Sequence, residues 1–299
     1  MSYPIRFPIG SPAPLASVHH PTPTTWELEM HHGLDNRINH EFIDKVLLKA
    51  LDHVEKDWRS STTEVGAPGA LIIVGTKSQQ KFFSNGLDFE GRSGTMDSSP
   101  VCTVLLAFRH ICSPLGTRLL RPVDEATYRF PNMFSVPIIA AINGHCFAAA
   151  FALALTCDYR VMTSGKAWCC MTEVELGASL PPSVAAVVNY RLPNARIARD
   201  ATLDAHRFTP QELHALGVID VLADGGTDGV LREAHKLAEA KAARAKTGVY
   251  GLMRTDMLKA VFNAAKLDER RAMACGCGGP RSRTTVAARL SIIYACTIK

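Results

Sequence analysis

The sequence lacks an uninterrupted apolar run of the roughly 18 residues that a membrane-spanning helix needs. Its longest apolar stretch, residues 136–155, is broken by Pro137, Asn143 and Gly144, which predicts a buried strand, a turn and a helix. The sequence also lacks a large excess of charge of either sign. Its formal net charge is only +5 over 299 residues, and the Lys and Arg residues are scattered. The composition therefore predicts no membrane span and no nucleic-acid partner.

Several common catalytic and cofactor-binding signatures are absent from the sequence. It contains no GxGxxG or P-loop motif and no nucleophile elbow with a Ser-His-Asp order. The nine cysteines are an odd number, and Cys102, Cys146 and Cys157 lie within apolar runs, where a free thiol behaves as a small hydrophobic group. The cysteine pairs at 169–170 and 275–277 have no second pair at zinc spacing. We expect a reducing compartment, no disulfide framework and no metal site.

The two ends of the chain differ in composition from its centre. Residues 1–25 contain six prolines and almost no acidic or basic residues, which predicts a poorly structured lead-in that is not a signal peptide. Residues 275–299 begin with CGCGGP and continue with scattered Arg and Thr, which predicts a divergent, disordered tail without an assigned role. The last three residues, TIK, differ from the peroxisomal address Ser-Lys-Leu, so no clear targeting signal is present.

Strands and helices are expected to alternate up to about residue 222, and helices alone are expected after it. Short apolar runs predict strands, and apolar residues spaced three or four apart predict helices. The strands are expected at residues 25–30, 69–75, 137–143, 158–162, 167–171 and 218–222, and the helices at 39–55, 101–111, 124–130, 148–155, 182–190, 209–217, 230–246 and 252–265. This order predicts an α/β core at 26–222 and a helical region at 223–274.

Two short segments have the pattern of a strand that runs into a glycine turn and then into the start of a helix. They are KFFSNGLD at residues 81–88 and NGHCFAAA at residues 143–150. The start of a helix leaves backbone N–H groups unpaired and carries partial positive charge. Two such ends that converge would form an oxyanion hole, which stabilises an enolate or a tetrahedral oxygen. A third segment, TEVELG at 172–177, supplies a carboxylate.

These segments resemble the crotonase (enoyl-CoA hydratase/isomerase) superfamily over about residues 26–222. FSNGLD at 83–88 is similar to the first oxyanion segment of the family, NGHCFAAAFAL at 143–153 to the second, and TPQELHALGVID at 209–220 to its helix–strand return. The resemblance implies an α/β fold of ββα turns wound as a spiral, followed by C-terminal helices that form trimers or dimers of trimers. It also implies an acyl-CoA substrate, with coenzyme A as part of that substrate and no separate cofactor.

The resemblance also assigns site residues by their positions in these motifs. The oxyanion N–H groups would come from Leu87 and Ala149. The turns and the coenzyme A contacts would involve Lys81, Phe83, Ser84, Gly86 and Gly144. Gly144 is expected to need positive φ. The chain departs from the family pattern at 148–150, where three alanines replace glycines and add methyl groups near the thioester.

The hydratases of this family use two glutamates, and the chain keeps one of the two positions. The first position is Ala152, which neither donates nor accepts a proton, and the second is Glu173. Apolar neighbours favour a raised pKa for Glu173, which suits a base that must also release its proton. Glu175 is the nearby competitor, and the alternative is that these carboxylates cap the next helix or face water. The Glu173 segment resembles that of the Δ3,Δ2-enoyl-CoA isomerases, which keep only this glutamate, and FFSNGLD at 82–88 resembles their plant and fungal members.

The resulting hypothesis is an enzyme that isomerises a 3-enoyl-CoA to the 2-enoyl-CoA through an oxyanion-stabilised enolate, with Glu173 as the proton shuttle. Two alternatives stay open: a hydratase-like enzyme of a fatty-acid, polyketide or toxin pathway, and a non-catalytic homologue that binds acyl-CoA. His145, beside the second turn, is a minor candidate for an auxiliary polar group, whereas Asp88 and Asp158 are more typical of structural carboxylates. The resemblance implies a peroxisomal or cytoplasmic location.

Overall fold

The computed structural model describes residues 2–39, 41–61, 66–88 and 135–264 of the chain. The helices predicted at 101–111 and 124–130 and the tail predicted at 275–299 lie outside these residues. In the described ranges, no helix is long and apolar enough to cross a membrane.

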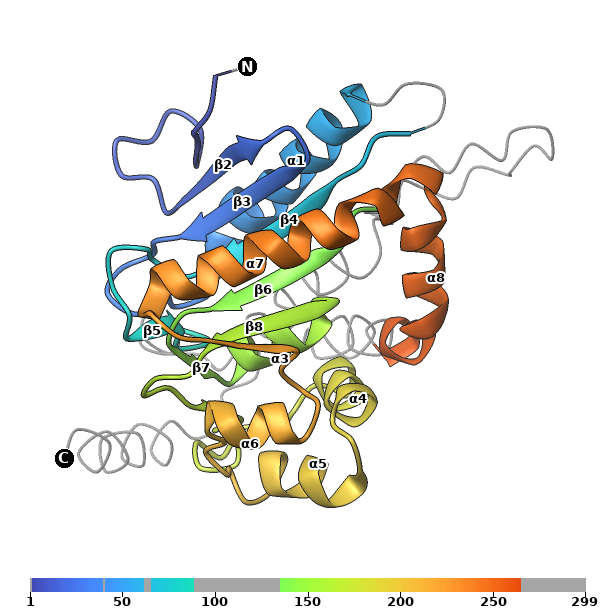
Figure 1. The fold of residues 1–299 in the computed structure, drawn as a ribbon. Coiled ribbons are helices and arrows are strands. Elements are labelled where there is room, and N and C mark those ends of the chain that lie inside the picture. Colours follow the sequence, from blue (N-terminus) through green and yellow to red (C-terminus); the bar gives the residue numbers. More distant parts are fainter. Residues whose placement is uncertain (1, 40, 62–65, 89–134, 265–299) are drawn as a thin grey trace, which may run out of the picture.

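Seven strands form the larger sheet, in the order β1-β2-β3-β4-β6-β8-β10 (Figure 1). Their bounds are Ile5–Phe7 (β1), Ala16–Thr22 (β2), Thr25–Met30 (β3), Ala70–Val74 (β4), Ile138–Ile142 (β6), Tyr159–Thr163 (β8) and Val221–Ala223 (β10). The pairs β1–β2 and β2–β3 are antiparallel, and all pairs from β3 to β10 are parallel. Every residue of β4 and β6 is buried, as expected for central parallel strands of aliphatic composition.

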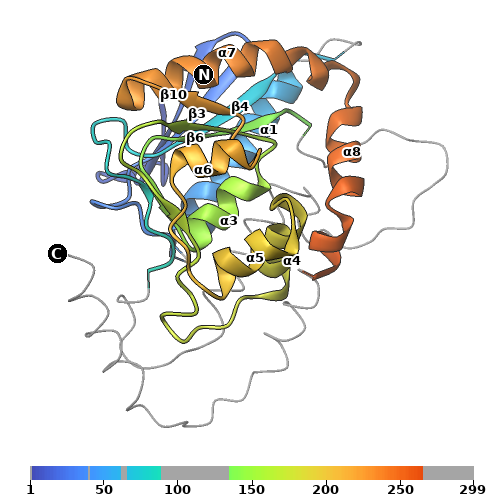
Figure 2. The ribbon, with the colours of Figure 1, turned by 60° about the horizontal axis from the view of Figure 1, so that its bottom comes forward.

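Helices cover both faces of this sheet (Figures 1 and 2). α7 (Gly226–Ala242) crosses one face and packs Val230, Ala234 and Ala238 against apolar side chains of β4, β6 and β8. The four-residue spacing places these three side chains on one side of the helix. The other face carries α1 (Leu48–Ser60), preceded by a π-helical segment at Phe42–Leu47, and α3 (Ala149–Thr156). The remaining helices are α4 (Pro182–Arg191), α5 (Ala195–Thr202), α6 (Pro210–Ala215), a 3-10 segment at Ala243–Thr247, and α8 (Val249–Met257).

A second sheet contains three short parallel strands in the order β5-β7-β9. They are Phe82–Ser84 (β5), His145–Phe147 (β7) and Cys169–Cys170 (β9). Each follows a strand of the larger sheet along the chain, because β4 precedes β5, β6 precedes β7 and β8 precedes β9. Successive turns of the chain therefore contribute one strand to each sheet.

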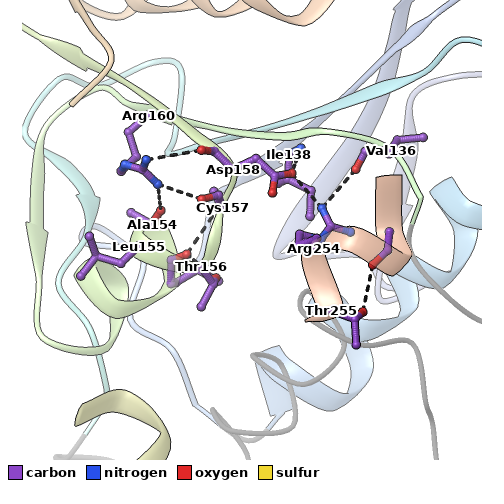
Figure 3. Close-up of polar contacts among 12 residues, drawn as sticks. Val136, Ile138, Ala154, Leu155, Thr156, Cys157, Asp158, Arg160, Arg254 and Thr255 are labelled. Carbon is purple, nitrogen blue, oxygen red and sulfur yellow. Dashed lines mark hydrogen bonds and ion pairs between the residues drawn. The ribbon is translucent and has the colours of Figure 1, made fainter. Parts of the chain in front are cut away.

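A buried ion pair attaches α8 to the core (Figure 3). Arg254 Nη1 lies 2.8 Å from Asp158 Oδ2 and also donates to the Val136 carbonyl oxygen at 3.3 Å. Asp158 Oδ2 accepts the Ile138 N–H at 2.9 Å. These contacts agree with the structural role expected for Asp158.

The architecture confirms the predicted α/β class, and strands or helices occur at most of the predicted positions within the described ranges. The structure differs from the expectation at the N-terminus, where residues 5–7 and 16–22 form β1 and β2 rather than a poorly structured lead-in. Proline is compatible with this arrangement because β1 is an edge strand and Pro21 lies next to the end of β2. The helix α5 and the strand β7 were not predicted.

Candidate active site

The small sheet brings the three predicted site segments to one edge. β7 and β9 are parallel, with Phe147 paired to Cys170, and β5 runs parallel to β7 on its other side. The carboxyl ends of parallel strands lie at the same edge of a sheet. A predicted site residue follows each strand within three residues: Leu87 after β5, Ala149 after β7 and Glu173 after β9.

Gly86 allows the first two segments to approach each other closely. Its φ is +81°, and a Cβ atom there would lie 2.7 Å from the Phe147 carbonyl oxygen and 3.4 Å from the Ala149 nitrogen. A side chain would therefore clash with the turn, and the positive φ independently favours glycine. The backbone at 86–87 consequently lies against the start of α3.

The backbone N–H of Leu87 has no acceptor among the described residues. A bridge to Ile38 uses the groups on either side of it: the Ile38 N–H donates to the Gly86 oxygen at 2.7 Å, and the Asp88 N–H donates to the Ile38 oxygen at 2.9 Å. In a parallel bridge of this kind, the N–H of the middle residue points away from the partner strand. Within the described part of the chain, this N–H is therefore left without a backbone partner, as an oxyanion donor requires.

The second N–H group belongs to Ala149, the first residue of α3. N–H groups of the first turn have no acceptor inside the helix, and the helix start carries partial positive charge. Ala148, which precedes it, has φ 51° and ψ −123°, a conformation that residues other than glycine rarely adopt. The Ala148 N–H donates to the Cys170 oxygen at 2.7 Å and so links this turn to β9. The turn therefore forms with alanine, at the cost of backbone strain at Ala148.

Glu173 carries a partly buried carboxyl group with a raised pKa. Its Oε2 atom is buried and has no hydrogen-bond partner within the described ranges, although the residue as a whole keeps some contact with solvent. Burial raises the pKa of Glu173 from 4.5 to about 7, and a backbone hydrogen bond opposes this rise. Glu173 does not cap the next helix, since the N-cap of α4 is Pro181. Glu175, the predicted competitor, is exposed.

The remaining predicted residues lie in or beside the turns. Phe83 is fully buried, and Ser84 Oγ donates to the Asn36 carbonyl oxygen at 2.6 Å. The expectation of positive φ at Gly144 is wrong: glycine is required because a Cβ atom would lie 2.6 Å from the Lys81 carbonyl oxygen. Lys81 is exposed immediately before β5, and its contact with coenzyme A stays a prediction.

Sequence reasoning missed Asn36, which supports the first turn. This buried residue has φ 52°, and its Nδ2 donates to the Phe83 carbonyl oxygen at 3.0 Å, while its Oδ1 accepts the His32 N–H at 2.8 Å. Asparagine tolerates positive φ better than most residues, which is a weak local signal. The contact with Phe83 spans 47 positions of sequence, and no local pattern indicates it.

A cavity of about 270 Å³ lies outside this group of residues. It is found at the carboxyl ends of β6 and β8 and at the start of α7, and its lining includes Gln80, Asn143, Thr163, Lys166 and Gly226. It includes none of Leu87, Ala149 and Glu173. Among the residues that the structure describes, no cluster of His, Cys, Asp or Glu is arranged to hold a metal ion.

Comparisons with known proteins agree with the resemblance of the motifs. The enoyl-CoA hydratase/isomerase family model matches residues 119–273. Enoyl-CoA delta isomerase 2, peroxisomal, of Arabidopsis thaliana is 27% identical over 232 residues, which cover 77% of this chain and 89% of that protein. A putative enoyl-CoA hydratase of Thermus thermophilus is 31% identical over 210 residues, 68% of each chain.

The fold also matches solved structures of enoyl-CoA isomerases and hydratases. The crystal structure of human mitochondrial delta3-delta2-enoyl-CoA isomerase superposes with a TM-score of 0.67 at 19% identity, over 95% of this chain and 98% of that chain. At this identity the likeness shows the fold alone, and the family is shown by the sequence match, which spans more than half of the chain. This chain belongs to the enoyl-CoA hydratase/isomerase family.

Proposed function

We propose that this protein is an isomerase that converts a 3-enoyl-CoA into the 2-enoyl-CoA. The observation that carries the proposal is a single carboxyl group, Glu173, whose pKa burial raises to about 7 and which follows the strand beside the Ala149 turn. Three Arabidopsis thaliana relatives, at 27–29% identity, are named enoyl-CoA delta isomerases, which supports the same reaction.

In the proposed reaction, the thioester oxygen accepts the N–H groups of Leu87 and Ala149. The Glu173 carboxylate removes a proton from C2, and the electron pair moves onto the thioester oxygen to form a dienolate. Glu173 then returns the proton to C4, the electrons move back from the oxygen, and the double bond passes from C3–C4 to C2–C3. The carboxylate is regenerated, and its pKa near 7 suits a group that both takes and releases a proton. Each oxyanion donor of this kind contributes about 10²–10³ in rate.

The absence of an ionisable group at position 152 supports isomerisation over hydration. Ala152 is fully buried within α3, at the position where the hydratases of the family carry their first glutamate. Addition of water in this family uses two carboxyl groups, whereas moving one proton from C2 to C4 needs only one. We therefore place the hydratase-like reaction second.

We further propose that coenzyme A enters only as part of the substrate and that the chain forms a homotrimer or a dimer of trimers through its C-terminal helices. The location proposed is peroxisomal or cytoplasmic, because two of the Arabidopsis relatives are named as peroxisomal. Light scattering of the purified protein would measure the oligomer, and imaging of the tagged full chain would test the location.

The direct test is conversion of 3-enoyl-CoA substrates of several chain lengths to the conjugated 2-enoyl-CoA, followed by ultraviolet absorbance. We expect Glu173→Gln to lower kcat by about 10²–10⁴, as loss of a general base does. Glu175→Gln is the matched control, since this neighbouring carboxylate is exposed, and it should retain turnover. Wild-type protein that binds acyl-CoA but converts none of the substrates would contradict the proposal and favour a binding role.

A further inference from the structure

His145 connects the two strands beside it through both its backbone and its side chain. It is the first residue of β7, and its N–H donates to the Lys81 carbonyl oxygen at 2.8 Å, at the start of β5. On the other side, its Nδ1 accepts the backbone N–H of Trp168 at 3.1 Å, just before β9. The next residue, Cys146, continues the ladder by donating to the Trp168 oxygen at 2.9 Å. The His145 ring thus adds a side-chain hydrogen bond to a sheet whose strands have only two or three residues.

The ring of His145 is fixed in this position by aromatic neighbours from all three strand segments. Its centroid lies 4.9 Å from that of Trp168 and 5.2 Å from that of Phe147, with interplanar angles of 15° and 24°. Phe82 of β5 completes the group at 5.5 Å. Since the Trp168 N–H occupies Nδ1, the neutral ring must carry its proton on Nε2.

Among the residues that the structure describes, the charged groups that face His145 are cations. They come from the segment before β5 (Lys81), the segment before β9 (Lys166) and the segment beside Phe208 (Arg207). Burial, followed by these three charges, lowers the pKa of His145 from its ordinary value of 6.5. The neutral ring that accepts the Trp168 N–H is therefore the form present at neutral pH.

We propose that neutral His145 is a positioning residue that holds β7, which leads to the Ala149 N–H, against the segment that leads to Glu173. This inference rests on the isomerase function proposed above. His145 does not touch the reacting atoms; it acts through the separation between the oxyanion donor and the base. Protonation puts a hydrogen on Nδ1, which then opposes the Trp168 N–H donor, and it adds a fourth positive charge to the group of three. The hydrogen bond between the strands is consequently lost in acid.

If neutral His145 is required for activity, log(kcat/KM) should fall in two successive steps as the pH is lowered. Below about pH 7, protonation of Glu173 makes log(kcat/KM) fall with a slope of one. Below the pKa of His145, which lies under 6.5, a second required group is protonated, and the slope should increase to two. The profile is measured for the full-length protein, with circular dichroism at each pH to verify that it stays folded.

Two variants separate the hydrogen bond from the bulk of the ring. Asparagine carries an acceptor oxygen and does not titrate, so His145→Asn should keep kcat at pH 8 and show a slope of one over the whole acid range. Phenylalanine keeps the aromatic packing but has no acceptor, so His145→Phe should lower kcat about tenfold at pH 8, with little change in KM. His19→Asn is the control, because His19 is a half-buried histidine of β2 with a lowered pKa, and this variant should keep the slope of two.

A slope of one in the wild type, or a slope of two that persists in His145→Asn, would overturn the inference while leaving the isomerase function intact. Absence of turnover by the wild type at pH 8 would instead overturn the proposed function and the catalytic part of the inference together. Nitrogen NMR of labelled histidine, assigned by comparison with His145→Asn, tests the hydrogen bond without turnover. A neutral His145 that carries its proton on Nδ1 would refute the role in any case.

Discussion

Replacing Glu173 by glutamine should stabilise the protein at pH 8, although it removes the proposed base. Burial raises the pKa of Glu173 from 4.5 to about 7, so the unfolded chain ionises at lower pH than the folded one. The free energy of unfolding therefore falls as pH rises from about 4.5 to about 7, because ionisation favours the unfolded state in this window. A pKa difference of about 2.5 corresponds to about 3 kcal/mol at 1.36 kcal/mol per pKa unit. Since water still reaches part of the side chain, we expect a gain of about 2 kcal/mol from the uncharged glutamine.

Urea-induced unfolding of the wild type and of Glu173→Gln at pH 8 and pH 5 measures this difference. The variant should be more stable by about 2 kcal/mol at pH 8 and by less than about 1 kcal/mol at pH 5, where the folded wild type is mostly protonated. Glu175→Gln should change stability by no more than about 0.5 kcal/mol at either pH, because this side chain is exposed. A variant that is less stable than the wild type at pH 8, or equally stabilised at both values, would refute the argument from burial.

Three further predictions concern the backbone of the site and the attachment of α8. Ala148→Gly should raise the free energy of unfolding by about 1 kcal/mol, since glycine adopts φ 51° without strain; a lower urea midpoint would contradict this. Gly86→Ala should lower kcat/KM at least about tenfold through the 2.7 Å clash, whereas Gly177→Ala, with positive φ but open surroundings, should keep its turnover. Asp158→Asn should lower the free energy of unfolding by about 3–5 kcal/mol, because it removes the carboxylate that neutralises the buried Arg254. An unchanged thermal midpoint would show that this ion pair contributes little to stability.

The parts of the fold that the sequence predicted correctly are those with a strong local pattern. The runs that form β4 and β6 are apolar throughout and can only be buried, and α6, at Pro210–Ala215, lies within the helix predicted at 209–217 and is capped by Thr209. The N-terminal strands were missed because six prolines in 25 residues suggest irregular chain. Edge strands accept proline, however, and the apolar residues Phe7, Ala16 and Val18 are buried in the core.

In the candidate site, too, the features with a local sequence pattern were predicted, and the contacts between residues far apart in the sequence were not. The glycine at 86 and the carboxyl group of Glu173 were predicted, because a turn and an apolar environment both leave a local pattern. Strands of two or three residues have no periodicity, so alternation did not indicate β7, whereas β9 lies within the apolar run predicted as a strand at 167–171. The hydrogen bond from the Trp168 N–H to His145 joins positions 23 apart, and only the structure places them together. Strain at Ala148 likewise becomes visible only once its φ is known.

The small sheet must keep two unfavourable features in place, the strained Ala148 and the desolvated Glu173, which together cost several kcal/mol. This is a considerable part of the 5–15 kcal/mol that stabilises a typical domain, and strands this short are marginal by themselves. Asn143, at the turn between β6 and β7, supplies part of the support. Its Nδ2 lies within 3.3 Å of the carbonyl oxygens of Thr76 and Gln79 and of Thr227 Oγ1. One buried side chain thus joins the end of a large-sheet strand, the segment that leads into β5 and the start of α7. The site can tolerate its strain because the small sheet is held by the stability of the large one.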